Sequence, residues 1–187
     1  MTFWVKKSLK LKFKEKIKNI KAIGFDVDGV LTNGTLTYFK NKEYKFFYVQ
    51  DGVGLILLKI AGIKTFIVTG KSSEIFKKRR KEIGIDYIYE KVKNKVFAIE
   101  DFLKKEKLKW YEICYMGDDL QDIPVMKKVG FAVAPSNSCD DVKKTAHFIC
   151  KNSGGNGAVR ELIELVLKEQ KKWKKIVNMY LQSLLEN

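Results

Sequence analysis

The chain has 187 residues, 45% of them hydrophobic, which is enough for one domain with a sizeable core but too few for two large domains. Three scattered cysteines and a single histidine argue against a disulfide framework, a zinc site and histidine-based catalysis. The net charge of +15 is compatible with nucleic acid, a membrane surface or an anionic small substrate as a partner.

Apolar runs typical of β-strands alternate with helical patterns along most of the chain. Strands are expected at 21–25, 64–70, 86–90, 112–117, 130–135 and 147–150. Helices are expected at 52–62, 72–84, 94–107, from about Leu120 to Val129, and as one long helix from about Gly157 to Leu185. This alternation predicts an α/β fold with a doubly wound, Rossmann-like parallel sheet that is covered by helices on both faces.

Residues 35–50 interrupt the alternation with β-forming residues around Asn41-Lys42, which predicts an inserted β-hairpin. Between Gly34 and Gly52 there is room only for this hairpin, so no cap domain is expected over the sheet. The hairpin's aromatic residues predict a buried interface rather than a nucleic-acid platform. They are Tyr38, Phe46, Phe47 and Tyr48.

We expect a basic N-terminal extension over residues 1–20, followed by one domain over 21–187 that includes the long C-terminal helix. Lysines gather in the extension and at 168–175, where solvation of the surface explains them. No apolar stretch approaches the roughly 20 residues of a membrane helix, and the start of the chain has no features of a secretory signal. We therefore expect a cytoplasmic protein without a membrane partner.

Polar side chains follow the ends of four predicted strands. Asp26 and Asp28 follow the first strand, Thr69 and Gly70 the second, and Lys95 comes at the helix start after the third. The fourth strand is followed by three further acids, Asp118, Asp119 and Asp122. Because parallel strands end at one edge of a sheet, these side chains are expected to converge there.

Such a cluster of carboxylates needs a cation, and oxygen ligands without histidine or cysteine favour Mg²⁺. A lysine and a hydroxyl beside the cation suit a phosphate group. One carboxylate can then attack phosphorus, and a second can protonate the leaving oxygen and activate water. Taken alone, Asp26 and Asp28 could also form a turn, and Thr69 could cap the next helix.

The order DxDGV, Thr-Gly, Lys and GDDxxD resembles the haloacid dehalogenase superfamily of phosphohydrolases. The resemblance implies that Asp26 is the nucleophile, that Asp28 is the acid and base, and that Thr69 and Lys95 bind the phosphoryl group. It also implies a Mg²⁺ site. Its ligands would be Asp26, Asp28 through its backbone carbonyl, and Asp118, with Asp119 in support.

Over about residues 20–170, the motifs YVQDGVG, GFAVAPSN and SGGNGAVRE resemble phosphatases of 3-deoxy-D-manno-octulosonate 8-phosphate, in the capless branch of the superfamily. This resemblance implies a phosphorylated sugar-acid substrate, a role in lipopolysaccharide biosynthesis and a homotetramer. In such a tetramer, hairpins assemble and a neighbour's C-terminal segment, made flexible by Gly154, Gly155 and Gly157, approaches the site. It implies substrate-side contacts from Asp51, Gly52, Gly70, Lys71, Arg79 and Asp122.

The chain departs from this family's pattern on the substrate side. Lys71 stands where arginine is usual, and Ile56 stands where a basic residue is frequent. A nine-carbon 2-keto-3-deoxy sugar acid 9-phosphate is the alternative substrate, although Lys71 favours the octulosonate because relatives that act on the nine-carbon ester often have an acidic residue there. A catalytically silent regulatory domain, a response-regulator receiver and a nucleic-acid-binding protein are further alternatives. The intact motif residues disfavour the silent domain, and the order of the motifs disfavours the receiver. No base-reading motif supports binding of nucleic acid.

Overall fold

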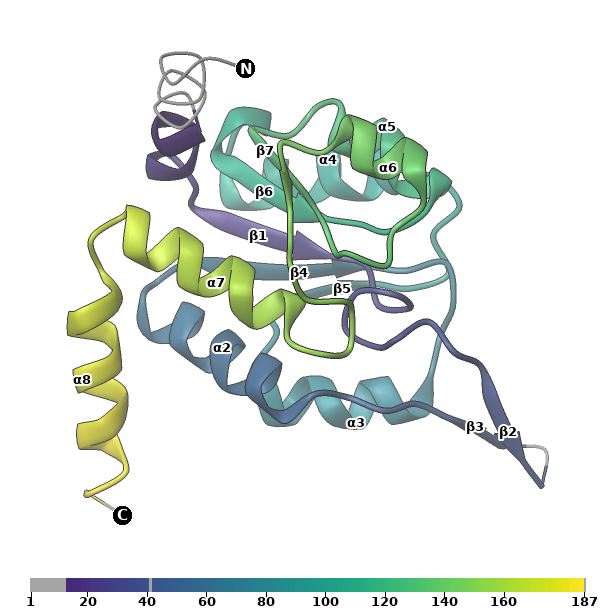
Figure 1. Cartoon of the computed structure of the whole chain (residues 1–187), viewed down its shortest axis with the longest axis horizontal. Helices are drawn as coiled ribbons and strands as arrows, with labels where there is room; N and C mark the ends of the chain where they lie inside the picture. Colours follow the sequence, from purple (N-terminus) through teal and green to yellow (C-terminus); the bar gives the residue numbers. More distant parts are fainter. Residues whose placement is uncertain (1–12, 41, 187) are drawn as a thin grey trace.

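The computed structural model describes residues 13–40 and 42–186. A six-stranded sheet forms the centre of the molecule, with the strand order β5-β4-β1-β6-β7-β8 and parallel pairing throughout (Figure 1). The strands are β1 (Ala22–Phe25), β4 (Lys64–Val68), β5 (Tyr87–Tyr89), β6 (Ile113–Met116), β7 (Phe131–Ala134) and β8 (Phe148–Ile149). The predicted doubly wound fold is confirmed.

Helices cover both faces of the sheet because side chains of each strand alternate between two apolar clusters. One face packs on α2 (Val49–Ile60), α3 (Glu74–Ile83), α7 (Ala158–Glu169) and α8 (Trp173–Ser183). The other face packs on α4 (Lys95–Glu106), α5 (Ile123–Met126) and α6 (Asp140–Thr145). Ile23 and Phe25 of β1 point to the first cluster, and Ala22 points to the second.

The central strand β1 is where the chain reverses its direction across the sheet. Its residue Ala22 pairs with Lys64 of β4 on one side and with Ile113 of β6 on the other. Loops that leave the carboxyl ends of these neighbouring strands diverge to opposite faces, and a crevice opens between them. This crevice holds the site described below.

The inserted hairpin is present and projects away from the sheet (Figure 1). It pairs β2 (Thr37–Phe39) with β3 (Lys42–Tyr44) in antiparallel register. Phe39 and Phe46 are exposed, whereas Phe47 packs on Phe76 of α3 with ring centroids 6.2 Å apart. Helix α2 begins at Val49, earlier than predicted.

The prediction of a single long C-terminal helix is wrong. The segment forms α7 and α8, which meet at an angle (Figure 1). Lys171 between them adopts a left-handed backbone with φ +59°, which ends the first helix and lets the second turn toward α2. The helix expected from about Leu120 is likewise shorter, because it is a 3₁₀ turn, η2 (Leu120–Asp122), followed by α5. Helix α6 and the 3₁₀ turn η1 (Trp110–Glu112) were not predicted.

The described end of the N-terminal extension packs on the domain. Ile17 and Ile20 are each only 2% exposed and belong to the apolar cluster under α7. The Gln170 side-chain amide donates to both of their carbonyl oxygens, at 3.0 and 2.8 Å. Residues 1–12 lie outside the described chain. Among the helices of residues 13–40 and 42–186, none has the length and apolar character needed to cross a membrane.

The tight packing of β1 against β4 generates a stability prediction. A Cβ added at Gly24 would lie 2.2 Å from ring atoms of Phe66, which is fully buried and lies against Phe102 with centroids 4.3 Å apart. We expect Gly24→Ala to lower the free energy of unfolding by about 1–3 kcal/mol through overpacking, as measured by urea denaturation. Gly70→Ala is the matched control, because its Cβ would meet no atom closer than 3.8 Å. Equal unfolding midpoints for both variants would contradict this packing.

Candidate active site

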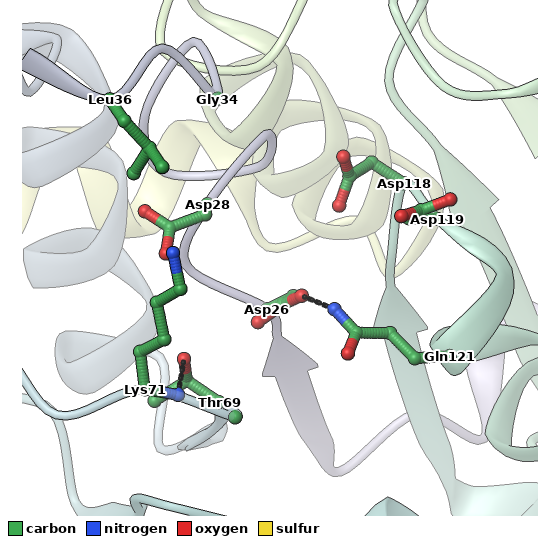
Figure 2. A pocket seen from close by; sticks show the side chains of 10 residues that line it. Asp26, Asp28, Gly34, Leu36, Thr69, Lys71, Asp118, Asp119 and Gln121 are labelled. Atoms are coloured by element: carbon green, nitrogen blue, oxygen red, sulfur yellow. Dashed lines mark hydrogen bonds between the residues drawn. The ribbon is translucent and has the colours of Figure 1, made fainter.

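A polar cavity of about 430 Å³ opens at the carboxyl ends of β1, β4 and β6 (Figure 2). Its walls come from the loops that follow these strands and from the connection that leads into the hairpin. The lining residues are Asp26, Asp28, Gly34, Leu36, Thr69, Gly70, Lys71, Asp118, Asp119 and Gln121. The structure thus brings together most of the side chains that were expected to converge.

The loop after β1 turns sharply around Asp26. The Val27 amide donates to Asp26 Oδ1 at 2.7 Å, and the Val27 carbonyl accepts the amides of Leu31 and Thr32. Gly29 adopts φ +85°, and a Cβ there would lie 1.9 Å from Asp118 Oδ2. Glycine is therefore required for two reasons: the left-handed turn and the close approach of the Asp118 carboxylate.

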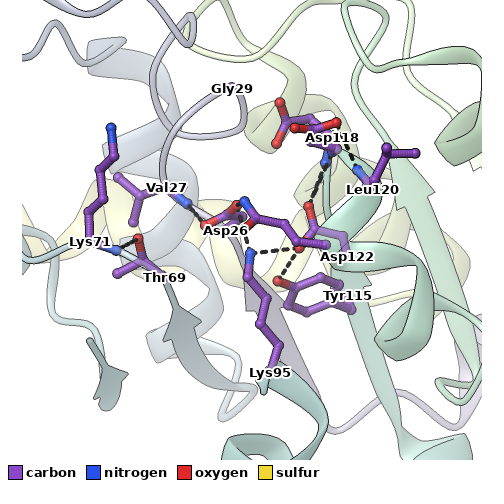
Figure 3. Close-up of polar contacts among 12 residues, drawn as sticks. Asp26, Val27, Gly29, Thr69, Lys71, Lys95, Tyr115, Asp118, Leu120 and Asp122 are labelled. Carbon is purple, nitrogen blue, oxygen red and sulfur yellow. Dashed lines mark hydrogen bonds and ion pairs between the residues drawn. The ribbon is translucent and has the colours of Figure 1, made fainter. Parts of the chain in front are cut away.

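Lys95, the first residue of α4, places its ammonium group between two buried carboxylates (Figure 3). Its Nζ lies 2.8 Å from Asp26 Oδ2 and 2.8 Å from Asp122 Oδ1. Burial acts to lower the pKa of Lys95, but the two carboxylates outweigh it and hold the pKa above its ordinary value. The ammonium is therefore a fixed positive charge behind Asp26, and Lys95 itself does not line the cavity.

Asp122 is fully buried and lies behind the cavity instead of lining it. Its Oδ1 accepts from Lys95 and from the Tyr115 hydroxyl at 2.8 Å. Its Oδ2 accepts from the amides of Asp118 and Asp119, at 3.0 and 3.3 Å. These contacts fix Lys95 and the loop after β6, and the expected substrate contact of Asp122 stays a prediction.

The acidic cluster fits a hard cation. Asp26, Asp118 and Asp122 each place one oxygen within 4.8 Å of the others, with Asp122 also held by its hydrogen bonds to Lys95 and the loop after β6. Among the described residues, Asp118 Oδ1 is buried without a hydrogen-bond partner. Burial, reinforced by neighbouring carboxylates, raises the pKa of Asp118 to about 7 and that of Asp26 to about 6. An all-oxygen donor set that is short of positive charge suits Mg²⁺.

Asp119 and Thr69 occupy the flanks of the cavity. Asp119 is exposed and caps η2, because its Oδ1 accepts from the Leu120 amide at 2.8 Å. Thr69 is 5% exposed, and its hydroxyl oxygen accepts the Lys71 amide at 3.3 Å, which leaves its proton available to a ligand. The Lys71 side chain extends along the same wall (Figure 2).

Three residues expected on the substrate side lie away from the cavity lining of this chain. Asp51 is 2% exposed and accepts the Arg160 amide at 2.7 Å, at the start of α7. At Gly52, a Cβ would lie 2.4 Å from Arg79 Nη2, so glycine lets α3 pack against α2. Arg79 itself pairs with Glu82 at 2.9 Å. Within the described chain, these residues join helices, and their contact with substrate stays a prediction.

The glycine-rich segment before α7 packs on the chain's own catalytic loop. The Gly155 amide donates to the Val30 carbonyl at 3.0 Å, and a Cβ at Gly154 would lie 1.8 Å from the Gly29 carbonyl oxygen. The Asn137 side chain joins the two segments, donating to the Gly29 carbonyl at 3.1 Å and accepting the Gly154 amide at 2.7 Å. Within this chain, Gly154 and Gly155 permit close approach of the two segments, and the expectation that the segment reaches a neighbour's site stays a prediction.

Two side chains at the site were not identified from the sequence. Gln121 lines the cavity, with its Nε2 3.5 Å from Asp26 Oδ2. Its place inside GDDxxD was a usable signal. The Lys45 ammonium group contacts Asp28 Oδ1 and lies 3.5 Å from Glu43 Oε1. The sequence offers no comparable signal for Lys45, because the pattern of a hairpin does not determine where the hairpin points.

Comparison with known proteins agrees with this geometry. The profile of a family described as haloacid dehalogenase-like hydrolase matches residues 82–162. The 3-deoxy-D-manno-octulosonate 8-phosphate phosphatase of Escherichia coli K12 is 37% identical over 158 residues, 84% of this chain and 84% of that protein. The chain belongs to the haloacid dehalogenase-like hydrolases.

Solved structures of this family support the assignment. A 3-deoxy-D-manno-octulosonate 8-phosphate phosphatase from Moraxella catarrhalis, in complex with a magnesium ion, a phosphate ion and a KDO molecule, has a TM-score of 0.87 and 38% identity over 90% of this chain and 98% of that chain. A subfamily IIIA hydrolase of the same superfamily from Legionella pneumophila has a TM-score of 0.93 and 37% identity over 96% and 99%. The resemblance inferred from the motifs is confirmed.

The raised pKa of Asp118 predicts how stability depends on pH. Between about pH 4 and pH 7, Asp118 holds a proton in the folded chain and releases it in the unfolded chain. In the presence of a chelator, the stability that comes from protonated Asp118 is fully present below about pH 4 and is lost as the pH rises to about 7. Asp118→Asn should flatten the fall in urea midpoint over this window, whereas Asp140→Asn, at an exposed site, should not. Parallel curves for wild type and Asp118→Asn would contradict the burial effect.

Proposed function

We propose that the chain is a Mg²⁺-dependent phosphomonoester hydrolase that acts through an aspartyl-phosphate, with 3-deoxy-D-manno-octulosonate 8-phosphate as its substrate in lipopolysaccharide biosynthesis. The observation that carries the proposal is the placement of Asp26. Its carboxylate lies at the base of the cavity, held by the Val27 amide and the Lys95 ammonium. Asp28, Thr69 and Asp118 surround it. The substrate follows from the named activity of the relatives in Escherichia coli and Moraxella catarrhalis.

The reaction has two successive displacements at phosphorus. In the first, an Asp26 oxygen forms a bond to phosphorus, the bond from phosphorus to the sugar oxygen breaks, and Asp28 gives that oxygen its proton. In the second, Asp28 takes a proton from water, the water oxygen bonds to phosphorus, and the bond to Asp26 breaks. The products are the sugar acid and inorganic phosphate, and both carboxyl groups return to their starting state.

The other residues hold the phosphoryl group. Lys95 and the Thr69 hydroxyl are placed to donate to its oxygens while Asp26 stays fixed. Asp26, Asp118 and the backbone carbonyl of Asp28 would hold Mg²⁺, with Asp119 in support. When bound, Mg²⁺ supplies positive charge that offsets the carboxylates and the phosphate and favours their approach.

A capless site needs another element to shield it, and we propose that a homotetramer of this chain does so in the cytoplasm. The support is the hairpin, which exposes Tyr38, Phe39 and Phe46 at 65%, 60% and 68%. Aromatic surface of this kind is a liability in an isolated chain and suits an interface between copies. Lys71 lines the cavity and is placed to meet the carboxylate of a sugar acid.

Removal of the nucleophile tests the chemistry. Asp26→Asn keeps the size of the side chain but cannot form the phosphoryl ester, so kcat should fall to below about one thousandth of the wild-type value. The loss should be the same for sugar phosphates and for an aryl phosphate, because every ester needs the nucleophile. Circular dichroism and urea denaturation should show a folded chain. Substantial turnover by the folded variant would contradict the role of Asp26.

Phosphate release from a substrate panel tests the specificity. The panel holds the octulosonate 8-phosphate, nine-carbon sugar-acid 9-phosphates, hexose phosphates and para-nitrophenyl phosphate, each with Mg²⁺. We expect kcat/KM for the octulosonate ester to exceed the others by about 10²-fold or more. A lead for the nine-carbon ester would show that the departures at Ile56 and Lys71 redirect the site. Absence of hydrolysis for every ester would favour a regulatory role.

A further inference from the structure

Lys45 is an inward-facing charge on an otherwise exposed hairpin. Its side chain is 3% exposed although the residue as a whole is half-buried, whereas its neighbours Tyr44 and Phe46 are exposed residues. A two-stranded hairpin is marginally stable alone, so its orientation depends on contacts with the body of the protein. Phe47 supplies an apolar contact on α3, and Lys45 supplies a polar one at the cavity.

The partner of Lys45 is Asp28. The ammonium contacts Asp28 Oδ1, and Glu43 Oε1 lies 3.5 Å away on the same hairpin. A buried ammonium is costly unless it is paired, so the pairing directs the Asp28 side chain toward the hairpin. With Oδ1 engaged by Lys45, Oδ2 is the atom of Asp28 left to exchange a proton. A proton on Oδ2 leaves Oδ1 free to accept from Lys45.

We propose that Lys45 is a positioning residue for catalysis: it fixes the Asp28 carboxyl so that Oδ2 meets the leaving oxygen, and it thereby ties the hairpin to the proton transfer. This inference rests on the proposed function, in which Asp28 is the acid. A carboxyl at the rim of an open cavity otherwise samples several rotamers, and most of them place the proton away from the reacting atoms. Holding one rotamer contributes to rate because proton transfer requires close contact.

The dependence on the leaving group separates this role from a structural one. A sugar alkoxide leaves poorly without a proton, whereas para-nitrophenolate leaves without one. A variant that misplaces the acid should therefore lose kcat/KM on the sugar ester and keep it on the aryl ester. A variant that damages the fold, the phosphate site or the metal site should lose on both.

The experiment measures kcat/KM with Mg²⁺ for the octulosonate 8-phosphate and for para-nitrophenyl phosphate. Asp28→Asn sets the benchmark and should lose about 10²-fold or more on the sugar ester but less than about tenfold on the aryl ester. Lys45→Met should follow the same pattern, with a loss of about tenfold or more on the sugar ester and less than about threefold on the aryl ester. Lys45→Arg, which keeps the charge, should recover part of the loss.

Matched controls come from the same hairpin. Lys42→Met removes an exposed lysine of β3 and should leave the ratio of the two kcat/KM values unchanged. Glu43→Gln removes the other carboxylate near Lys45 without altering Asp28 and should change the ratio by less than about threefold. If Lys45→Met does not fold by circular dichroism, Lys45→Gln replaces it in the same comparison.

The outcomes distinguish the two proposals. If Asp28→Asn shows the leaving-group dependence and Lys45→Met loses equally on both esters, or on neither, the positioning role of Lys45 is overturned while the proposed function stands. If Asp28→Asn loses equally on both esters, the acid assignment fails and the inference fails with it. Selective loss in both variants, with partial recovery by arginine, supports the inference.

Discussion

The ammonium of Lys95 is the charge around which the site is arranged. Asp26 and Asp122 each lie 2.8 Å from it, and all three groups are almost completely removed from water. Two carboxylates at this depth repel one another, and burial penalises each of them. The ammonium offsets both effects, and its own pKa rises in return. The ammonium at the start of α4 thus allows the acids that follow β1 and β6 to lie close together.

Asp122 transmits this arrangement to the loop after β6. One of its oxygens is held by Lys95 and Tyr115, and the other holds the amides of Asp118 and Asp119. The Asp118 carboxylate is then presented to the cavity, and its buried Oδ1 has no hydrogen-bond partner among the described residues. Both oxygens of Asp122, which supports the site, are thus hydrogen-bonded, whereas Asp118, which faces the cavity, keeps one oxygen without a partner. This division of roles is what a cation site requires.

The sequence was most informative where backbone direction decides the outcome. Parallel strands end at one edge, so the positions of Asp26, Thr69 and Asp118 follow from strand order alone. It was less informative where side-chain direction decides. Asp122 and Asp51 carry the same charge as the cavity acids, yet packing turns one toward Lys95 and the other toward the start of α7. Local sequence does not encode that choice.

The other differences between the predictions and the structure come from single backbone positions and from long-range contacts. Lys171 ends α7 in a left-handed conformation that lysine seldom adopts, so no sequence signal marked the break in the C-terminal helix. Lys45 belongs to a chain rich in solvated lysines, and only the fold shows that it contacts Asp28. The surroundings of such residues can be predicted only when the position of one element relative to another is known.

The way residues 13–20 join the sheet also affects how the protein can be handled. They lead into the amino end of β1, at the opposite edge of the sheet from the cavity, and Gln170 holds them there (Figure 1). A fluorescent reporter or a surface linker joined to an exposed side chain of this segment, such as Lys18, would therefore start from that opposite edge. Labelled or immobilised forms of the chain can then be assayed directly with small esters.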